Sequence, residues 1–212
     1  MSALIARLFS VTAALLALIV TVAGGAAAPG HSHVANYISE LGARGAAHGE
    51  VVSLAGFLPI GITSLVALAA SVRLETNRRL KASIAWMLTL PLAYIVAAFA
   101  RCTQGCAGLD GAQAIHNIAG MAEYSGGAIA LSVAGSVFSR SGRGSLSAVF
   151  WVAAAGVFVC LLCLGQPQFE YRGAVQRLAE IALFAFLLFL AWHGQRPNNS
   201  LEGSRDRYSN DP

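Results

Sequence analysis

The chain has 212 residues, of which 56% are hydrophobic and only 11% are charged. Soluble domains carry about 25% charged residues, so this composition excludes an ordinary soluble domain and favours an integral membrane protein. The formal net charge of +4 does not indicate a nucleic-acid partner, because the sequence has no basic stripe with interleaved aromatic residues.

Six apolar runs are long enough to cross a bilayer, for which a helix needs roughly 20 residues. Backbone polar groups in lipid must be satisfied within their own segment, so each run is expected to be a helix. The short connections predict an all-α six-helix transmembrane bundle over residues 1–194, and the polar residues 195–212 are expected to form a disordered cytoplasmic tail. The predicted spans are approximately Leu8–Ala28, Val51–Val72, Ser83–Ala100, Ala114–Phe138, Leu146–Leu164 and Leu178–Trp192.

The uneven distribution of basic residues predicts the orientation, because lysine and arginine concentrate in cytoplasmic loops. Ten of the 14 basic residues lie before the first span, after the second, after the fourth or after the last: Arg7, Arg73, Arg78, Arg79, Lys81, Arg140, Arg143, Arg196, Arg205 and Arg207. Both termini are therefore predicted to be cytoplasmic. The segment AGGAAAPG resembles a signal-peptide cleavage site, but the apolar run before it is about 20 residues long, which favours a spanning helix.

The loop after the first span has a high density of polar residues. Its sequence from His31 to Glu50 is HSHVANYISELGARGAAHGE, within an otherwise apolar chain. The orientation predicts that this loop is extracytoplasmic. We expect it to form an outer lid that contributes Ser39, Glu40 and His48 to a polar site.

The loop after the third span, RCTQGCAGLDG, contains two cysteines with three residues between them. The predicted orientation places Cys102 and Cys106 in an oxidising compartment, where a disulfide is permitted. Gly105 in the turn allows the two Cα atoms to come within the required distance of about 4.4–6.8 Å. The alternative is a thiolate metal site, which needs further ligands. Cys160 and Cys163 lie within the fifth span and are expected to be small packing residues.

Glu123 lies inside the fourth span, where an ionisable residue is costly and marks either a functional site or an internal ion pair. His116, Gly120 and Glu123 are spaced by four and three residues, so they share one helix face. One interpretation of this face is a strip of small residues, continued by Gly127, that allows close helix packing. The other is the polar wall of a cavity, and both can hold together.

The last span begins with Arg177 and Glu180, which are three residues apart and can pair on one helix face. The alternative is that Arg177 is an interfacial anchor that contacts a lipid phosphate.

The segment YISELGARGAAH, from Tyr37 to His48, resembles a bacterial membrane family known as domain of unknown function 998 (DUF998). Its members have six predicted helices, an ISELGA-like segment after the first helix and a histidine at the start of the fourth, as His116 is in IHNIAG. The resemblance covers roughly residues 8–192 and implies a multi-pass protein of the bacterial inner membrane. The family is distantly similar to the eukaryotic Frag1/DRAM/Sfk1 group, some of whose members are linked to lipid remodelling. The resemblance therefore implies membrane lipids as partners and no settled activity.

The first functional hypothesis is an enzyme that acts on a lipid or lipid-linked group at the outer leaflet. A divalent metal such as zinc, held by three ligands with an open position for water, is one route, and a serine nucleophile paired with a histidine is another. Neither an HExxH nor a GxSxG motif is present in the sequence. The candidate residues are Ser39, Glu40, His48, His116 and Glu123 for catalysis, Tyr37, Arg177 and Glu180 for substrate binding, and His48, His116 and Asp110 for the metal.

Two other functions remain open. A proton- or cation-coupled small-molecule transporter would use Glu123 as the ion carrier, although the sequence shows neither a polar path to the inner side nor the inverted repeats common in transporters. A non-catalytic membrane scaffold would use the outer loop as a folded cap.

Overall fold

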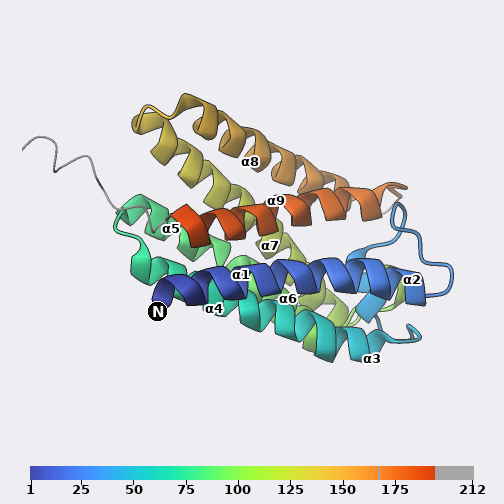
Figure 1. The fold of residues 1–212 in the computed structure, drawn as a ribbon. Coiled ribbons are helices and arrows are strands. Elements are labelled where there is room, and N and C mark those ends of the chain that lie inside the picture. The colour runs from blue at the N-terminus through green and yellow to red at the C-terminus, as the bar shows by residue number, and fades with distance from the viewer. Residues whose placement is uncertain (167, 194–212) are drawn as a thin grey trace, which may run out of the picture.

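The computed structural model describes residues 1–166 and 168–193, and the predicted tail lies outside this part of the chain. Within it the structure is helical and contains no strand, so the predicted all-α fold class is confirmed. Figure 1 shows long helices lying roughly side by side as a bundle. Their bounds are α1 (Ser2–Ile19) continuing through η1 (Val20–Gly24) into α2 (Gly25–Ala27), α3 (Gly49–Val51) continuing through η3 (Val52–Phe57) into α4 (Leu58–Leu74), α5 (Arg78–Met87) followed by α6 (Thr89–Phe99), α7 (Gly111–Arg140), α8 (Gly144–Leu164) and α9 (Arg172–His193).

Five helical segments of the described chain are long and apolar enough to cross a membrane. They are Ser2–Ala27, Gly49–Leu74, Arg78–Phe99, Gly144–Leu164 and Arg172–His193. The remaining helix, α7, is the longest single helix at 30 residues but is less apolar, since it contains Glu123 and several glycines and serines. A multi-pass arrangement is thus supported, whereas the count of six spans and the side of each terminus stay predictions.

The helices pack as two antiparallel pairs joined by a crossing helix. α1 lies along α4, α7 lies along α8, and α9 passes between α1 and α8, as Figure 1 shows. α5 and α6 pack on the other side of α7. Leucines from four helices fill the centre with almost no exposed surface, namely Leu68, Leu90, Leu131 and Leu183. Burying apolar side chains so completely holds the helices together through close packing.

Residues 28–48 and 100–110 form two loops at one end of the bundle, which we call the loop end. A short 3-10 helix, η2 (Ile38–Gly42), lies in the first loop, and η4 (Gln104–Cys106) lies in the second. The backbone N–H of Arg44 donates a 2.8 Å hydrogen bond to the carbonyl of Cys102. The guanidinium of Arg101 donates to the carbonyls of Gly42 and Ala43, at 2.8 and 2.9 Å. These bonds tie the two loops into one cap.

The η2 helix is held down onto the bundle at both of its ends. The side chain of Ile38 is only 5% exposed, and its backbone N–H donates a 2.6 Å hydrogen bond to the side-chain oxygen of Gln176 on α9. At the other end, a Cβ on Gly42 would lie 2.5 Å from the ring of Phe57. Glycine is therefore needed at Gly42 because the backbone approaches the ring too closely for any side chain.

Candidate functional site

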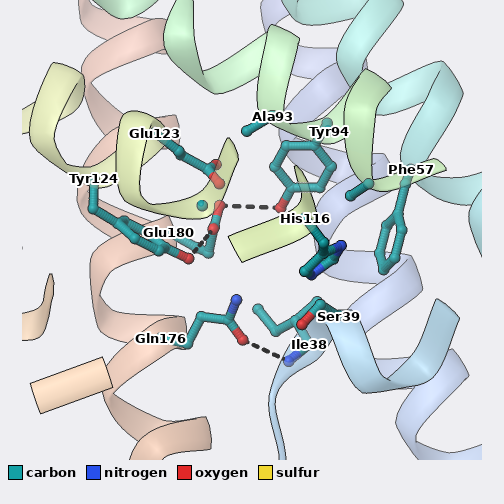
Figure 2. A pocket seen from close by; sticks show the side chains of 12 residues that line it. Ile38, Ser39, Phe57, Ala93, Tyr94, His116, Glu123, Tyr124, Gln176 and Glu180 are labelled. Atoms are coloured by element: carbon teal, nitrogen blue, oxygen red, sulfur yellow. Dashed lines mark hydrogen bonds between the residues drawn. The ribbon is translucent and has the colours of Figure 1, made fainter. Parts of the chain in front are cut away.

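A polar pocket of about 60 Å³ lies inside the bundle next to η2 (Figure 2). A volume of this size holds a few water molecules or a small polar group. At 1.5 Å per residue, Glu180 lies roughly 12 Å along α9 from its start at the loop end. The polar residues that line the pocket are Ser39, Tyr94, His116, Glu123, Tyr124, Gln176 and Glu180, and the other lining residues are Ile38, Phe57, Ala93, Ala97 and Gly120.

Glu180 is the most highly bonded side chain of the pocket. Its two carboxyl oxygens accept hydrogen bonds from the hydroxyls of Tyr94 on α6, at 3.0 Å, and of Tyr124 on α7, at 2.8 Å. Figure 2 shows the two tyrosines approaching the carboxyl from different sides. Hydrogen bonds to an ionised group contribute about 1.5–3 kcal/mol each. Three helices are thus joined through one buried carboxyl group.

Glu123 lines the same pocket but lacks such partners. Its side chain is buried, with 7% of the residue exposed, and its Oε1 atom has no hydrogen-bond partner in the described structure. Figure 2 shows its carboxyl pointing toward the space that Glu180 also faces. Two carboxylates in one small pocket repel each other when both are charged, and a proton or a cation between them removes that repulsion.

His116 lies closer to the loop end of α7 than Glu123 does, and a backbone bond fixes its ring. Its Nδ1 atom lies 3.0 Å from the carbonyl oxygen of Ala100. A carbonyl can only accept, so Nδ1 carries the hydrogen, and in the neutral ring Nε2 keeps a free lone pair. His116 can therefore accept a proton or bind a metal through Nε2.

Ser39 completes the pocket from the η2 helix. Its hydroxyl lies 3.4 Å from Sγ of Cys106, within hydrogen-bond distance for sulfur. Ser39 and His116 both line the pocket, but no hydrogen bond joins them within the described residues. The structure brings together the predicted nucleophile and base without forming the bonded pair that a serine mechanism uses.

Glu40 lies next to Ser39 but does not line the pocket. Its Oε1 accepts a 3.0 Å hydrogen bond from the backbone N–H of Tyr37, which forms a capping box at the start of η2. Its carboxyl also lies 3.5 Å from the guanidinium of Arg172 and accepts a bond from the side chain of Asn36. These contacts give Glu40 a structural role in the loop, and its predicted catalytic role stays a prediction.

The predicted pairing of Arg177 with Glu180 is not found. Arg177 instead donates to the backbone carbonyls of Asn36 and Gly173, and its Nη2 atom lies 3.1 Å from Nε2 of His31. The carboxyl of Glu180 is bonded by the two tyrosines instead. Arg177 holds the first loop onto α9.

Tyr37, also predicted as a substrate-binding residue, contacts the loop end as well. Its hydroxyl donates to the carbonyl of Leu164, and the guanidinium of Arg172 lies 4.8 Å above its ring. It is not among the residues that line the pocket.

The three predicted metal ligands do not converge in the described structure. His48 is exposed at the start of α3. Asp110 is exposed at the start of α7, where it accepts a 2.9 Å hydrogen bond from the backbone N–H of Gln113 and pairs with Arg44. These two interactions hold the pKa of Asp110 below its usual value. The trio of possible metal ligands that does converge within the described residues is Cys102, Cys106 and His116.

The predicted disulfide between Cys102 and Cys106 is present, with the two Cα atoms 5.1 Å apart. Gly105 adopts a φ of 75° in the intervening turn, as expected for a position that favours glycine. Cys160 and Cys163 on α8 are free thiols.

Tyr94, Tyr124 and Gln176 line the pocket but were not among the residues predicted from the sequence. A tyrosine within an apolar span needs a hydrogen-bond partner for its hydroxyl, and this signal could have pointed to the first two. Their shared partner could not be identified, because it lies on a third helix.

Comparison with known proteins gives one family match. The model of the family described as protein of unknown function (DUF998) matches residues 11–193. No curated protein and no solved structure matches the chain.

Proposed function

The chain belongs to the DUF998 family, and we propose that its polar pocket binds the cationic headgroup of an amine-bearing membrane lipid from the extracytoplasmic side. The observation that carries this proposal is the unpartnered carboxyl oxygen of Glu123 in a pocket that it shares with Glu180.

An ammonium group suits the chemistry of the pocket. A buried carboxyl oxygen without a partner is unfavourable, and an ammonium group supplies both a positive charge and three hydrogen-bond donors. The rings of Phe57 and Tyr94 line the same space, with centroids 5.9 Å apart, and aromatic faces attract cations. A small cavity also selects a primary ammonium over a bulkier quaternary group.

The surroundings of Gly120 favour a lipid as the molecule that carries this ammonium. Gly120 lines the pocket, and a Cβ at this position would meet no other atom within 4 Å. Its neighbours Ile118 and Met121 are 60% and 54% exposed on the surface of α7. In a bilayer such apolar side chains face lipid, so the glycine leaves a lateral entrance through which a headgroup can reach the carboxyls.

The positive-inside rule supports an extracytoplasmic position for the pocket. The basic residues concentrate at the opposite end of the bundle, around the connection between α4 and α5 and the connection between α7 and α8. The pocket therefore lies near the predicted outer face, where it can meet lipids of the outer leaflet.

A proton- or cation-coupled transporter is a second candidate, and the facing carboxyls of Glu123 and Glu180 favour it. Such a pair can exchange a proton for a cationic substrate. It differs from simple lipid binding because it requires net movement of protons across the membrane.

The test uses the full-length protein in mild detergent, titrated with a short-chain phosphatidylethanolamine and with its N-acetylated form, which lacks the positive charge. We expect the amine lipid to bind and the acetylated lipid to bind about 10- to 100-fold more weakly, as for loss of a charged hydrogen bond. Glu123→Gln should cause a similar loss, whereas the exposed Glu50→Gln should not.

Equal binding of the two lipids, or full binding by a well-folded Glu123→Gln variant, would contradict the proposal. Proton uptake by sealed vesicles that contain the protein, lost in Glu123→Gln, would instead favour the transporter.

A further inference from the structure

Three side chains with metal-binding atoms meet where the second loop joins α7. Sγ of Cys102, Sγ of Cys106 and a ring nitrogen of His116 all lie within 4.8 Å of one another. Two are contributed by the loop and one by the first turns of the helix. The disulfide occupies both sulfurs in the structure described here.

We propose that Cys102, Cys106 and His116 form a zinc site when this disulfide is reduced. Two thiolates and an imidazole are preferred ligands of Zn²⁺, with distances of about 2.3 Å to sulfur and about 2.0 Å to nitrogen. Two sulfurs that bind one tetrahedral zinc ion lie about 3.8 Å apart. The three atoms can therefore reach a single ion after the S–S bond breaks, with little movement of the backbone.

The hydrogen bond between His116 and Ala100 prepares the histidine for this role. Metal-binding histidines usually donate their other ring N–H to a carbonyl or carboxylate, which orients the ring and fixes its tautomer. Nδ1 of His116 bonds to the carbonyl of Ala100, only two residues before Cys102. Nε2 is thus the nitrogen available to the ion. The segment from Ala100 to Cys102 positions two of the three ligands, because it contains Cys102 and bonds the ring of His116.

The three ligands lie beside the polar pocket. His116 lines that pocket, and so does Ser39, whose hydroxyl is 3.4 Å from Sγ of Cys106. Three protein ligands with an open fourth position are typical of catalytic rather than structural zinc sites. A water molecule bound there would be adjacent to the pocket.

Reduction requires a dithiol as the electron donor. Cys102 is fully buried, whereas Cys106 is partly exposed, so the thiolate of the dithiol attacks Sγ of Cys106. The S–S bond breaks, Cys102 leaves as a thiolate, and it takes up a proton. The second thiol of the donor then displaces Cys106, leaving the donor as a disulfide and both cysteines as thiols. Zinc binding releases the two thiol protons.

The experiment titrates the full-length protein in detergent with Co²⁺, a spectroscopic substitute for Zn²⁺, and then displaces the cobalt with Zn²⁺. The parent is a Cys160→Ser/Cys163→Ser variant, which removes the other two thiols. We expect the reduced parent to bind one Co²⁺ with thiolate-to-cobalt charge-transfer absorption, and the oxidised parent to show none. His116→Ala should weaken binding by at least about 100-fold, since even changes to residues behind a ligand cost 10- to 100-fold.

Two further variants keep the result decisive. His116→Cys should bind cobalt with stronger charge-transfer absorption, because it replaces the nitrogen with a third thiolate. His48→Ala should bind as the parent does. Absence of the absorption in the reduced parent, or unchanged affinity in His116→Ala, would overturn the proposal. Loss of binding in His48→Ala with retention in His116→Ala would point to a different ligand set. Cobalt binding is measured without added lipid, so its result does not depend on whether the pocket binds lipid.

Discussion

The hydroxyl of Tyr124 donates a 2.8 Å hydrogen bond to Oε1 of Glu180 and thereby joins α7 to α9, two helices that otherwise make few contacts. Tyr94 bonds the other carboxyl oxygen from α6. The polar pocket is therefore part of what holds the bundle together.

Replacing Tyr124 with phenylalanine should destabilise the protein. The change removes one donor from a buried carboxyl group without altering the packing of the ring, and such bonds contribute about 1.5–3 kcal/mol. Thermal unfolding in detergent measures the effect. Tyr171→Phe is the matched control, since Tyr171 is 58% exposed. Equal unfolding temperatures for Tyr124→Phe and the wild type would show that this bond does not stabilise the bundle.

Two glycines on α7 should respond differently to alanine. A Cβ at Gly127 would lie 2.4 Å from Leu183 on α9, whereas one at Gly120 would meet nothing within 4 Å. We expect Gly127→Ala to cost about 1–3 kcal/mol through overpacking. Gly120→Ala should be neutral or stabilising by up to about 1 kcal/mol, because alanine is the better helix former.

A larger residue at Gly120 tests the proposed entrance. Gly120→Leu should leave the unfolding temperature near that of the wild type but weaken binding of the amine lipid, because the side chain fills the open space beside the pocket. Unchanged binding by a folded Gly120→Leu variant would place the entrance elsewhere.

Glu40→Ala should lower stability without changing ligand binding. The variant loses the capping box with Tyr37 and the ion pair with Arg172, and loss of a helix cap costs about 0.5–2 kcal/mol. Unfolding temperature and lipid affinity measured on the same preparation separate the two effects. A variant that unfolds normally but no longer binds lipid would support the direct site role predicted from the sequence.

His31 should make the protein less stable in mild acid. Burial lowers the pKa of His31 below 6.5, the charges of Arg177 and His33 lower it further, and Glu40 acts in the opposite direction. Below pH 6.5 the unfolded chain therefore binds a proton at His31 that the folded chain does not, so stability falls as the pH decreases from 6.5 to the folded pKa. Above pH 6.5 this effect is absent.

Unfolding temperatures measured between pH 8 and pH 5 check this expectation. The decline with acid should be smaller in His31→Gln than in the wild type, and the exposed His48→Gln should behave as the wild type does. Parallel curves for His31→Gln and the wild type would assign the decline to other groups.

The helical segments and the disulfide could be predicted from local sequence alone. Each predicted span corresponds to a helix because lipid requires backbone bonding within one segment, so a long apolar run needs no distant partner to define it. Cys102 and Cys106 are four residues apart, so the local turn alone brings them together. The same local reasoning identified His116 and Glu123 as neighbours on one face of α7.

Which polar residues share the pocket depends on contacts between helices and could not be predicted. Tyr94, Tyr124 and Glu180 come from three helices, and their meeting depends on how each helix is rotated about its axis and packed against the others. Spacing within one helix could not show that Glu180 bonds the tyrosines in preference to Arg177. In the same way, adjacent loop residues separate: Ser39 faces the pocket while Glu40 caps η2, because successive residues of a tight helix point in different directions.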